Sequence, residues 1–340
     1  MAVLGATGIV GQRFVQLLVG HPWFELVAVA ASEKSAGKKY SEAAKWHVGD
    51  EMPEEVASLA VRECTPEALR GVDLVFSALP SRVAGPIEEK IASRGFPIVS
   101  NAASHRMDPD VPLLIPEVNP DHIELLEEQK RRRKWDGFIV ANPNCTSSVL
   151  AISLKPIHDQ YKLDSVIASS MQAVSGAGYP GLSFLDISGN VIPYIKSEEE
   201  KLEEETKKIL GSLRQPADIT VSASCHRVPT RDGHMISVFL KTVNEVDVED
   251  LYFLLQSFNP LENLNLPTAP IPPIKVFRMP DRPQTSRDVY YGNGMGICVG
   301  RIRKCDVLTL KYVVLGHNTI RGGAGMGVLN AELLKVRGVL

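Results

Sequence analysis

Three glycines within the first eleven residues constrain the fold of this chain most strongly. A short apolar run, Ala2 to Leu4, leads into Gly5-Ala-Thr-Gly8-Ile-Val-Gly11, and a helical stretch follows from Ile9 to Val19. The apolar run from Glu25 to Ala31 then indicates a buried strand. This order predicts the βαβ unit of a dinucleotide-binding domain, although the glycines follow GxxGxxG rather than GxGxxG.

The residues after the second strand bear on which dinucleotide the domain binds. A helix that starts at a glycine turn directs backbone N–H groups and its positive end at a phosphate. The second strand ends in Ala31-Ser32-Glu33-Lys34-Ser35. Ser32, Lys34 and Ser35 suit the 2′-phosphate of NADP, whereas Glu33 would suit the ribose hydroxyl of NAD. We predict NADP(H), with Glu33 as the opposing observation.

Strand-like and helical segments alternate as far as residue 141, which predicts a doubly wound parallel sheet. The expected strands are 72–76, 96–100 and 137–141, and the expected helices are 84–94 and 121–134. Beyond residue 160 the strand-like segments are longer and few helices separate them, which predicts an α+β domain with a mainly antiparallel sheet. These segments are 164–173, 218–225, 235–243, 296–302 and 307–315.

Two further segments complete the predicted organisation. Six prolines between Leu266 and Pro283 indicate a surface loop, and Asn318 to Val336 becomes helical and is expected to return to the first domain. A chain of 340 residues suggests two domains. We therefore predict a Rossmann-type dinucleotide-binding domain over 1–143 and 318–340. The second domain, over 144–317, would be catalytic.

Composition excludes several classes of function. The net charge of −3, from 37 basic and 40 acidic residues, gives no general attraction to nucleic acid or to anionic membranes. The basic run 130–134 follows several glutamates and is interpreted as a solvated helix end. Five scattered cysteines without a CxxC pair argue against a disulfide scaffold and a structural metal site. With no long apolar run and no secretion signal, we expect a cytoplasmic protein.

One cysteine stands in a context that favours reactivity. The run Asn142-Pro-Asn144-Cys145-Thr-Ser-Ser148 follows a predicted strand, and a helical stretch begins directly after the cysteine. The positive end of a helix stabilises a thiolate and lowers the pKa of the thiol. Cys145 is therefore the candidate nucleophile. The other four cysteines lack this context and are interpreted as structural, namely Cys64, Cys225, Cys298 and Cys305.

A thiolate beside a nicotinamide cofactor points to one reaction class, in which an acyl group passes through a thioester on the cysteine. Such a reaction needs an acid or base and a group that binds anions. The segment Cys225-His-Arg227-Val-Pro-Thr-Arg-Asp-Gly-His234 supplies candidates for both. His234 would serve as the acid or base, and the Arg227 guanidinium suits a carboxylate.

Taken together, these segments resemble the aspartate-semialdehyde dehydrogenase family, most closely its archaeal and fungal branch. The resemblance extends through the whole chain and is most specific in NPNCTSS and CHRVPTRDGH. The remaining matching segments are GATGIVG, ASEKSAGK, NAASHR, MQAVSGAGYPG, NVIPYI, SEEEKLEEETKKILG and HNTIRGGAG. The resemblance implies NADPH-dependent reduction of L-4-aspartyl phosphate to L-aspartate 4-semialdehyde, with release of inorganic phosphate. This step belongs to lysine, threonine and methionine biosynthesis, and the family assembles as homodimers or homotetramers through its second domain.

The resemblance also implies roles for individual residues. Cys145 would form the thioester, His234 would be the general acid/base, and Gln172 would lie beside the nucleophile. Arg227 would bind the substrate carboxylate and Glu198 its ammonium, while Arg106, Lys201 and Asn144 would contact phosphate. The cofactor would be held by Gly5, Thr7, Gly8, Ile9 and Val10 at the pyrophosphate, by Ser32, Lys34 and Ser35 at the 2′-phosphate, and by Ser77, Gly176 and Asn318 elsewhere.

Three alternatives stay open at this point. One is a malonyl-CoA reductase of the same fold, and another is an N-acetyl-glutamyl-phosphate reductase that uses the same cysteine chemistry. The third is a catalytically silent NADP-binding sensor. The phosphate-binding candidates Arg106 and Lys201 favour the phosphate-using enzyme over the CoA-thioester reductase. The complete set of Cys145, Gln172, Arg227 and His234 argues against a silent sensor.

Overall fold

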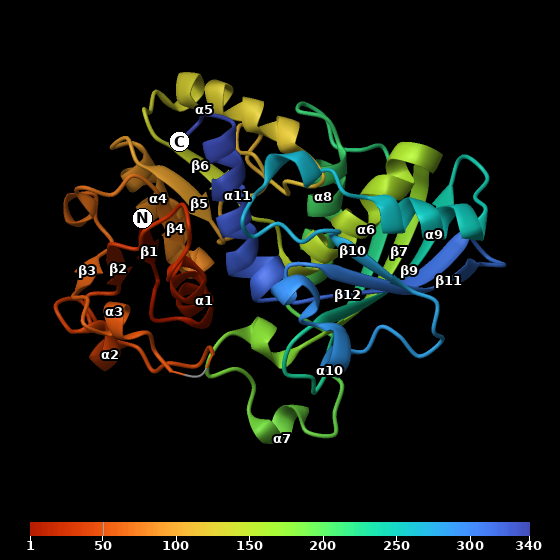
Figure 1. Cartoon of the computed structure of the whole chain (residues 1–340), viewed down its shortest axis with the longest axis horizontal. Helices are drawn as coiled ribbons and strands as arrows, with labels where there is room; N and C mark the ends of the chain where they lie inside the picture. Colours follow the sequence, from red (N-terminus) through yellow and green to blue (C-terminus); the bar gives the residue numbers. More distant parts are fainter. Residues whose placement is uncertain (50) are drawn as a thin grey trace. The chain divides into compact units, whose positions relative to one another are not determined.

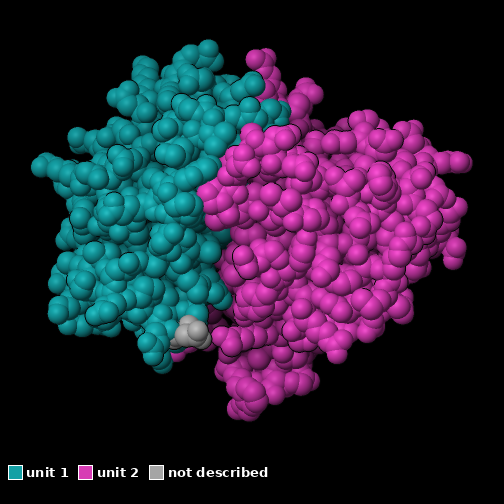
Figure 2. Space-filling model, viewed as in Figure 1, with its two compact units in different colours: residues 1–114, 120–143, 323–340 teal, residues 115–119, 144–322 magenta. Residues whose placement is uncertain are grey.

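The computed structural model describes residues 1–49 and 51–340 and divides into two compact units, coloured separately in Figure 2. Unit 1 contains residues 1–114, 120–143 and 323–340, and unit 2 contains residues 115–119 and 144–322. Sequence boundaries assigned 115–119 and 318–322 to the first domain, whereas both segments belong to unit 2. A buried ion pair joins these two segments, with Arg321 Nη2 2.6 Å from Glu117 Oε2.

Unit 1 is built on a six-stranded sheet in the order β3-β2-β1-β4-β5-β6, with every pairing parallel (Figure 1). This is the strand order of a Rossmann sheet, so the predicted fold class is confirmed. The strands are β1 (Ala2–Leu4), β2 (Ala28–Ala31), β3 (Val61–Glu63), β4 (Val75–Ser77), β5 (Pro97–Ser100) and β6 (Phe138–Ala141). The helices are α1 (Ile9–Leu18), α2 (Tyr40–Ala43), α3 (Glu54–Ala57), α4 (Ser81–Ala92), α5 (Leu125–Arg133) and α11 (Gly325–Val336).

The short strands of unit 1 agree with the pattern in the sequence, with differences at β2, β3 and β4, the last of which is Val75–Ser77 instead of the expected 72–76. The second strand is shorter than expected and starts at Ala28, and β3 was not predicted. β3 is an edge strand of three residues whose burial falls along its length, so its sequence carries little hydrophobic signal. The basic end of α5 includes Arg133, which donates hydrogen bonds to Asp110 and Asp108 instead of lying free in solvent.

Gly5 allows the turn after β1 to pass close to the turn after β4. These two neighbouring strands mark the point where the strand order reverses, which is where nucleotides bind in such sheets. Gly5 has a φ of +69°, and a Cβ at this position would lie 2.6 Å from the carbonyl oxygen of Ala78. A side chain is therefore excluded both by the backbone conformation and by its neighbour.

Unit 2 contains a second six-stranded sheet in the order β10-β11-β12-β9-β7-β8. Its strands are β7 (Leu163–Gln172), β8 (Thr220–Arg227), β9 (His234–Thr242), β10 (Ile274–Phe277), β11 (Ile297–Lys304) and β12 (Leu310–Gly316). Its helices are α6 (Cys145–Tyr161), α7 (Phe184–Ile187), α8 (Glu198–Leu210), α9 (Val248–Ser257) and α10 (Thr285–Asp288). Helix α6 packs against the central strands and also contacts α8 and α9.

The second sheet is mixed. The three central pairings are antiparallel, as predicted, whereas β7–β8 and β10–β11 at the two edges are parallel. The proline-rich segment 266–283 is not entirely a loop, because Ile274–Phe277 forms β10 and pairs with β11. These four residues contain no proline, and the pairing lies at the sheet edge, where neighbouring prolines are tolerated.

We expect Gly5→Ala to destabilise the protein more than Gly20→Ala. Both glycines have a positive φ, but the space around Gly20 is open to at least 4 Å. The left-handed conformation alone should cost about 1–2 kcal/mol in the free energy of unfolding. The contact with Ala78 should add roughly 1–3 kcal/mol for Gly5→Ala. Thermal and denaturant unfolding measure the difference, and equal losses for the two variants would contradict the close approach.

Candidate active site

The candidate nucleophile begins the longest helix of unit 2. Helix α6 starts at Cys145, and Asn144 caps it by accepting hydrogen bonds from the N–H groups of Thr146 (2.8 Å) and Ser147 (3.4 Å). The predicted helix start at this cysteine is therefore confirmed. A thiolate at Cys145 would face the positive end of a helix of 17 residues. Gly322 packs against the other side, where a Cβ would lie 2.5 Å from the Cβ of Cys145.

The sulfur of Cys145 lies 3.2 Å from Nε2 of His234, the first residue of β9. The other ring nitrogen of His234, Nδ1, accepts a hydrogen bond of 3.1 Å from the N–H of Ala173. A neutral imidazole that accepts at Nδ1 carries its proton at Nε2. His234 therefore presents an N–H donor to the Cys145 sulfur, which favours the thiolate.

Burial determines the charge state of His234. The side chain is completely buried, and burial lowers its pKa to about 3, with the nearby Arg227 guanidinium acting in the same direction. His234 is therefore neutral at physiological pH. Neutrality agrees with the hydrogen bond from Ala173, because a protonated ring could not accept at Nδ1.

Arg227 and Gln172 are neighbours on the parallel pair β7–β8, where they are paired in register. Both side chains are buried, and Arg227 donates from Nη1 to the carbonyl oxygen of Ala173 at 2.7 Å. Burial lowers the pKa of Arg227, and the charges of Cys145 and Glu198 oppose this effect. The peptide groups of Ala173 thus fix His234 through the N–H and Arg227 through the carbonyl.

Gly176 lies directly against this pair. A Cβ on Gly176 would lie 2.7 Å from Nη1 of Arg227 and 3.2 Å from Cε1 of His234, so the close approach requires glycine. Asn318 accepts from the N–H of Gly233 and donates to Ser175 Oγ, both at 2.8 Å. It therefore connects the backbone next to His234 with the side chain of Ser175, the residue next to Gly176.

Helix α8 places a carboxylate among the remaining predicted residues. Glu198 accepts two hydrogen bonds from the side-chain amide of Asn144, at 3.1 and 2.9 Å. It also accepts from Lys201 Nζ at 3.1 Å and from Gln172 Nε2 at 3.4 Å. The nine sequence-predicted residues of unit 2 therefore form one connected cluster. They are Asn144, Cys145, Gln172, Gly176, Glu198, Lys201, Arg227, His234 and Asn318.

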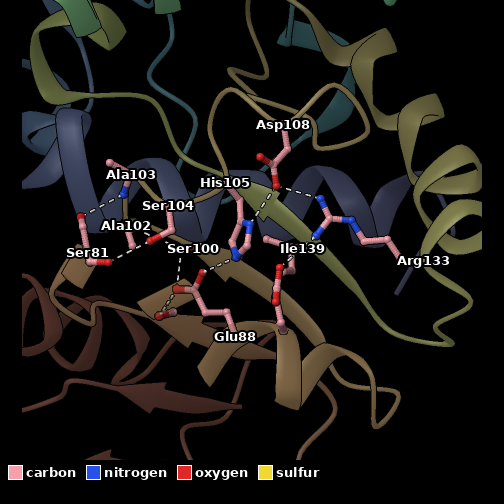
Figure 3. A network of polar contacts seen from close by, with 12 residues as sticks. Ser81, Glu88, Ser100, Ala102, Ala103, Ser104, His105, Asp108, Arg133 and Ile139 are labelled. Atoms are coloured by element: carbon pink, nitrogen blue, oxygen red, sulfur yellow. Dashed lines mark hydrogen bonds and ion pairs between the residues drawn. The ribbon is translucent and has the colours of Figure 1, made fainter. Parts of the chain in front are cut away.

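Arg106 is predicted to bind phosphate and lies in a loop of unit 1 after β5. Its Nη2 donates to the carbonyl oxygen of Asn101 at 2.9 Å. Figure 3 shows the polar contacts that shape this loop, in which the hydroxyl of Ser100 donates to Glu88 at 2.7 Å and accepts from the N–H of Ala102 at 3.1 Å.

Glu88 is a buried carboxylate of α4, and burial raises its pKa. Its second oxygen lies 3.8 Å from Nε2 of His105, whose Nδ1 lies 2.9 Å from Asp108 (Figure 3). Arg133 donates to the same oxygen of Asp108 at 2.8 Å. Ionisable side chains therefore link the buried Glu88 of α4 to His105 and Asp108, which lie on either side of Arg106 in the sequence.

Unit 1 contains a cavity of about 730 Å³ at the carboxyl ends of its strands. The predicted cofactor residues Gly5, Thr7, Gly8, Ser32 and Lys34 line it. Sequence reasoning did not identify the further lining residues Ala31, Glu63, Cys64, Thr65, Ala78, Leu79, Pro80, Arg82, Val83 and Ile87. Cys64 and Thr65 follow β3, and Ala78, Leu79 and Pro80 follow β4. Nucleotides bind at the carboxyl ends of such strands, so the position of these residues is the signal that could have identified them.

Four other predicted cofactor residues of unit 1 lie outside the lining of this cavity. Ile9 and Val10 begin α1, and Ser35 accompanies Ser32 in a turn. The hydroxyl of Ser77 donates to Glu88 at 2.6 Å. The opposing residue, Glu33, does line the cavity together with Ser32 and Lys34.

The remaining cysteines differ from Cys145 in their surroundings. Burial raises the pKa of Cys225 to about 11 and that of Cys298 to about 12, which disfavours thiolates at both positions. Cys64, interpreted as structural, lines the cavity of unit 1, and burial raises its pKa as well.

Within residues 1–49 and 51–340, no group of three or more potential ligand side chains could hold a metal ion. In the same residues, no helix is long and apolar enough to span a membrane.

Comparison with known proteins gives two family matches. Residues 1–126 match the NAD-binding domain of semialdehyde dehydrogenase, and residues 154–321 match the dimerisation domain of the same family. The chain is 53% identical over 338 residues to an aspartate-semialdehyde dehydrogenase of Archaeoglobus fulgidus, covering 98% of this chain and 97% of the relative.

Two further relatives bear on the cofactor and on the choice of substrate. The crystal structure of aspartate-semialdehyde dehydrogenase with NADP from Candida albicans matches with a TM-score of 0.92 at 42% identity, covering 100% of this chain and 99% of that chain. A malonyl CoA reductase (NADP) of Metallosphaera sedula is 40% identical over 348 residues, covering 100% of this chain and 97% of the relative.

The neutral state of His234 should make stability depend on pH. Its pKa is about 3 in the folded protein and 6.5 in the unfolded chain, so the unfolded state takes up a proton first as the pH falls. Between pH 7 and pH 5 this single group should cost about 2 kcal/mol of stability. His234→Gln can keep both hydrogen bonds and does not titrate. We expect its melting temperature to fall less over this interval than that of the wild type, and parallel curves would contradict the assignment.

Proposed function

Because this chain belongs to the semialdehyde dehydrogenase family, we propose that it reduces L-4-aspartyl phosphate to L-aspartate 4-semialdehyde with NADPH. Inorganic phosphate is released in this direction and consumed in the reverse one. The observation that carries the proposal is the Cys145 sulfur at the start of α6, 3.2 Å from the Nε2–H of His234. The full-length identity to aspartate-semialdehyde dehydrogenases supports the choice of substrate.

The reaction starts at Cys145. Its thiolate attacks the acyl carbon of aspartyl phosphate, a carbon–sulfur bond forms, and the carbon–oxygen bond to phosphate breaks. When bound, NADPH supplies the hydride that reduces the resulting thioester to the aldehyde level. The carbon–sulfur bond then breaks and the Cys145 thiolate is restored. The Nε2–H of His234 is available to the sulfur and to an oxyanion formed beside it.

Charged side chains around Cys145 suit the carboxylate, the ammonium and the phosphate of the substrate. Arg227 presents a guanidinium for the carboxylate, held by the carbonyl of Ala173. Glu198 is the carboxylate available to the substrate ammonium, but Lys201 Nζ already lies 3.1 Å from one of its oxygens. We propose that the two ammonium groups compete for Glu198, so that the bound substrate releases Lys201 to the phosphate.

The residues of unit 1 fit NADP(H). The cavity is lined by the glycine turn after β1 and by Ser32 and Lys34 after β2. Gly8 has no side chain and stands immediately before α1, so its surroundings suit a pyrophosphate at the helix start. The hydroxyl of Ser32 and the ammonium of Lys34 would hold the 2′-phosphate. Arg106 is not proposed as a cofactor ligand; it is proposed to bind the substrate phosphate, on the resemblance of its segment alone.

We also propose a homodimer or homotetramer that works in the cytoplasm. The match of residues 154–321 to a dimerisation domain supports self-association. The five free cysteines agree with a reducing compartment.

A malonyl-CoA reductase is the second candidate function. The identity of 40% to a relative with that name favours it, because the match extends through the whole chain. This reaction would need neither a carboxylate for a substrate ammonium nor a site for inorganic phosphate. Glu198 and Lys201 therefore favour aspartyl phosphate.

Two assays that follow NADPH directly separate the two functions. We expect NADPH formation from L-aspartate 4-semialdehyde to require inorganic phosphate, and we expect NADPH oxidation with malonyl-CoA to be slower by at least about a hundredfold, a difference of about 2.7 kcal/mol in activation free energy. Cys145→Ala should abolish turnover while NADPH binding persists. Phosphate-independent activity on malonyl-CoA would replace the first proposal with the second, and near-normal turnover by Cys145→Ala would exclude the thioester.

Lys201→Gln tests the phosphate site. Removal of one ammonium that contacts the phosphate should raise the KM for phosphate about tenfold or more, because charge-assisted hydrogen bonds contribute roughly 1.5–3 kcal/mol. The KM for aspartate semialdehyde should change little. Steady-state kinetics in the phosphorylating direction measure both constants, with Lys208→Gln as the control on the same helix. An unchanged KM for phosphate would exclude Lys201 from this site.

A further inference from the structure

Two carboxylates of α8 converge on the residue that precedes the nucleophile. Glu198 accepts from the side-chain amide of Asn144, and Glu205 Oε2 accepts from the backbone N–H of Asn144 at 2.6 Å. The two glutamates lie seven residues apart, which is about two helical turns, so they project from the same face of α8. That face packs against α6.

Glu205 stands in an unusual environment for a carboxylate. Its side chain is 2% exposed, and the neighbouring residue Thr206 and the preceding-turn residue Leu202 are completely buried. A buried carboxylate is costly unless hydrogen bonds replace its contacts with water. The 2.6 Å distance to the Asn144 N–H is short, as expected when the acceptor is charged. Neither the residue patterns nor the proposed mechanism assigns a role to this group.

The contact with Asn144 constrains the nucleophile through the chain itself. Asn144 is held at its backbone by Glu205, at its amide nitrogen by Glu198, and at its amide oxygen by the first turn of α6. The next residue is Cys145, and Gly322 leaves no free space behind its Cβ. A shift of Asn144 would therefore move the sulfur relative to His234.

We infer that Glu205 is a positioning residue, which holds the Asn144–Cys145 peptide so that the Cys145 sulfur faces the Nε2–H of His234. The inference rests on Cys145 as the nucleophile of the proposed function. It assigns the effect to an acceptor oxygen at the correct distance from Asn144, and not to the negative charge of the carboxylate.

Two variants separate the effect of the length of the Glu205 side chain from the effect of its charge. Glu205→Gln keeps the length of the side chain and an acceptor oxygen but removes the charge. Glu205→Asp keeps the charge but shortens the side chain by one methylene. Glu204→Gln is the matched control, because Glu204 is the exposed neighbour on the same helix. Each variant is assayed as the full chain for kcat and KM, and the rate of Cys145 carbamidomethylation by iodoacetamide is measured without substrate.

We expect Glu205→Asp to lower kcat per titratable Cys145 thiol about tenfold, which corresponds to about 1.4 kcal/mol in activation free energy. KM values should stay within about twofold, since the ligands of the substrate are unchanged. Cys145 alkylation should slow in parallel, because the thiolate loses its donor. Glu205→Gln and Glu204→Gln should stay within about threefold of the wild type in both measurements.

Any other ranking of the three variants in kcat and alkylation rate overturns the inference. Normal activity and alkylation in Glu205→Asp would show that the length of the side chain does not matter for the position of Cys145. A slow Glu205→Gln variant would show that an uncharged acceptor oxygen is not sufficient to hold Asn144. A role in folding alone would lower the melting temperature and leave the alkylation rate and kcat per thiol unchanged. The alkylation rate needs no substrate, so it remains informative if the chain fails to turn over aspartyl phosphate.

Discussion

The proposed chemistry of unit 2 depends on the contact between the Cys145 sulfur and the His234 imidazole. Its two partners come from different elements, since Cys145 begins α6 and His234 begins β9. A helix start supplies a positive electrostatic environment, and a neutral imidazole supplies a hydrogen-bond donor. Both effects stabilise a thiolate, and the charge of the nearby Arg227 acts in the same direction. Complete burial of His234 is compatible with this arrangement because the ring stays uncharged.

The peptide groups of a single residue direct two of the side chains in this cluster. The N–H of Ala173 selects the tautomer of His234, and its carbonyl holds the guanidinium of Arg227. Ala173 can serve both because it follows the last residue of β7, beside the end of β8 and the start of β9. The mixed pairing of the second sheet is therefore a condition for the site. A parallel β7–β8 pair brings Gln172 level with Arg227, and an antiparallel β7–β9 pair brings His234 to the same end.

The sequence is sufficient for the parts of this protein that depend on local patterns. The glycine turn, the helix start at Cys145 and the alternation in unit 1 all follow from neighbouring residues, and each is present in the structure. The roles of Ala173 and Glu205 could not be predicted in this way. Ala173 acts through peptide groups that any residue has, and Glu205 is one of six glutamates in α8 whose burial depends on packing against α6. The edge strands β3 and β10 were missed because three or four residues carry too little periodicity.

The proposed preference for an aspartyl substrate has a physical basis in the same cluster. A relative named malonyl CoA reductase (NADP) matches this chain over its whole length at 40% identity, so similarity of this extent does not by itself select the acyl group. An aspartyl substrate adds an ammonium, and its phosphate adds a doubly charged leaving group. In this chain Glu198 already holds an ammonium, that of Lys201, 3.1 Å from its oxygen and close to Asn144. A site in which one ammonium can replace another costs less to occupy than one in which a carboxylate must first be stripped of water. In the proposed function, the Lys201 ammonium therefore occupies the place beside Glu198 that the substrate ammonium would take, and an acyl group without an ammonium would leave Lys201 beside Glu198.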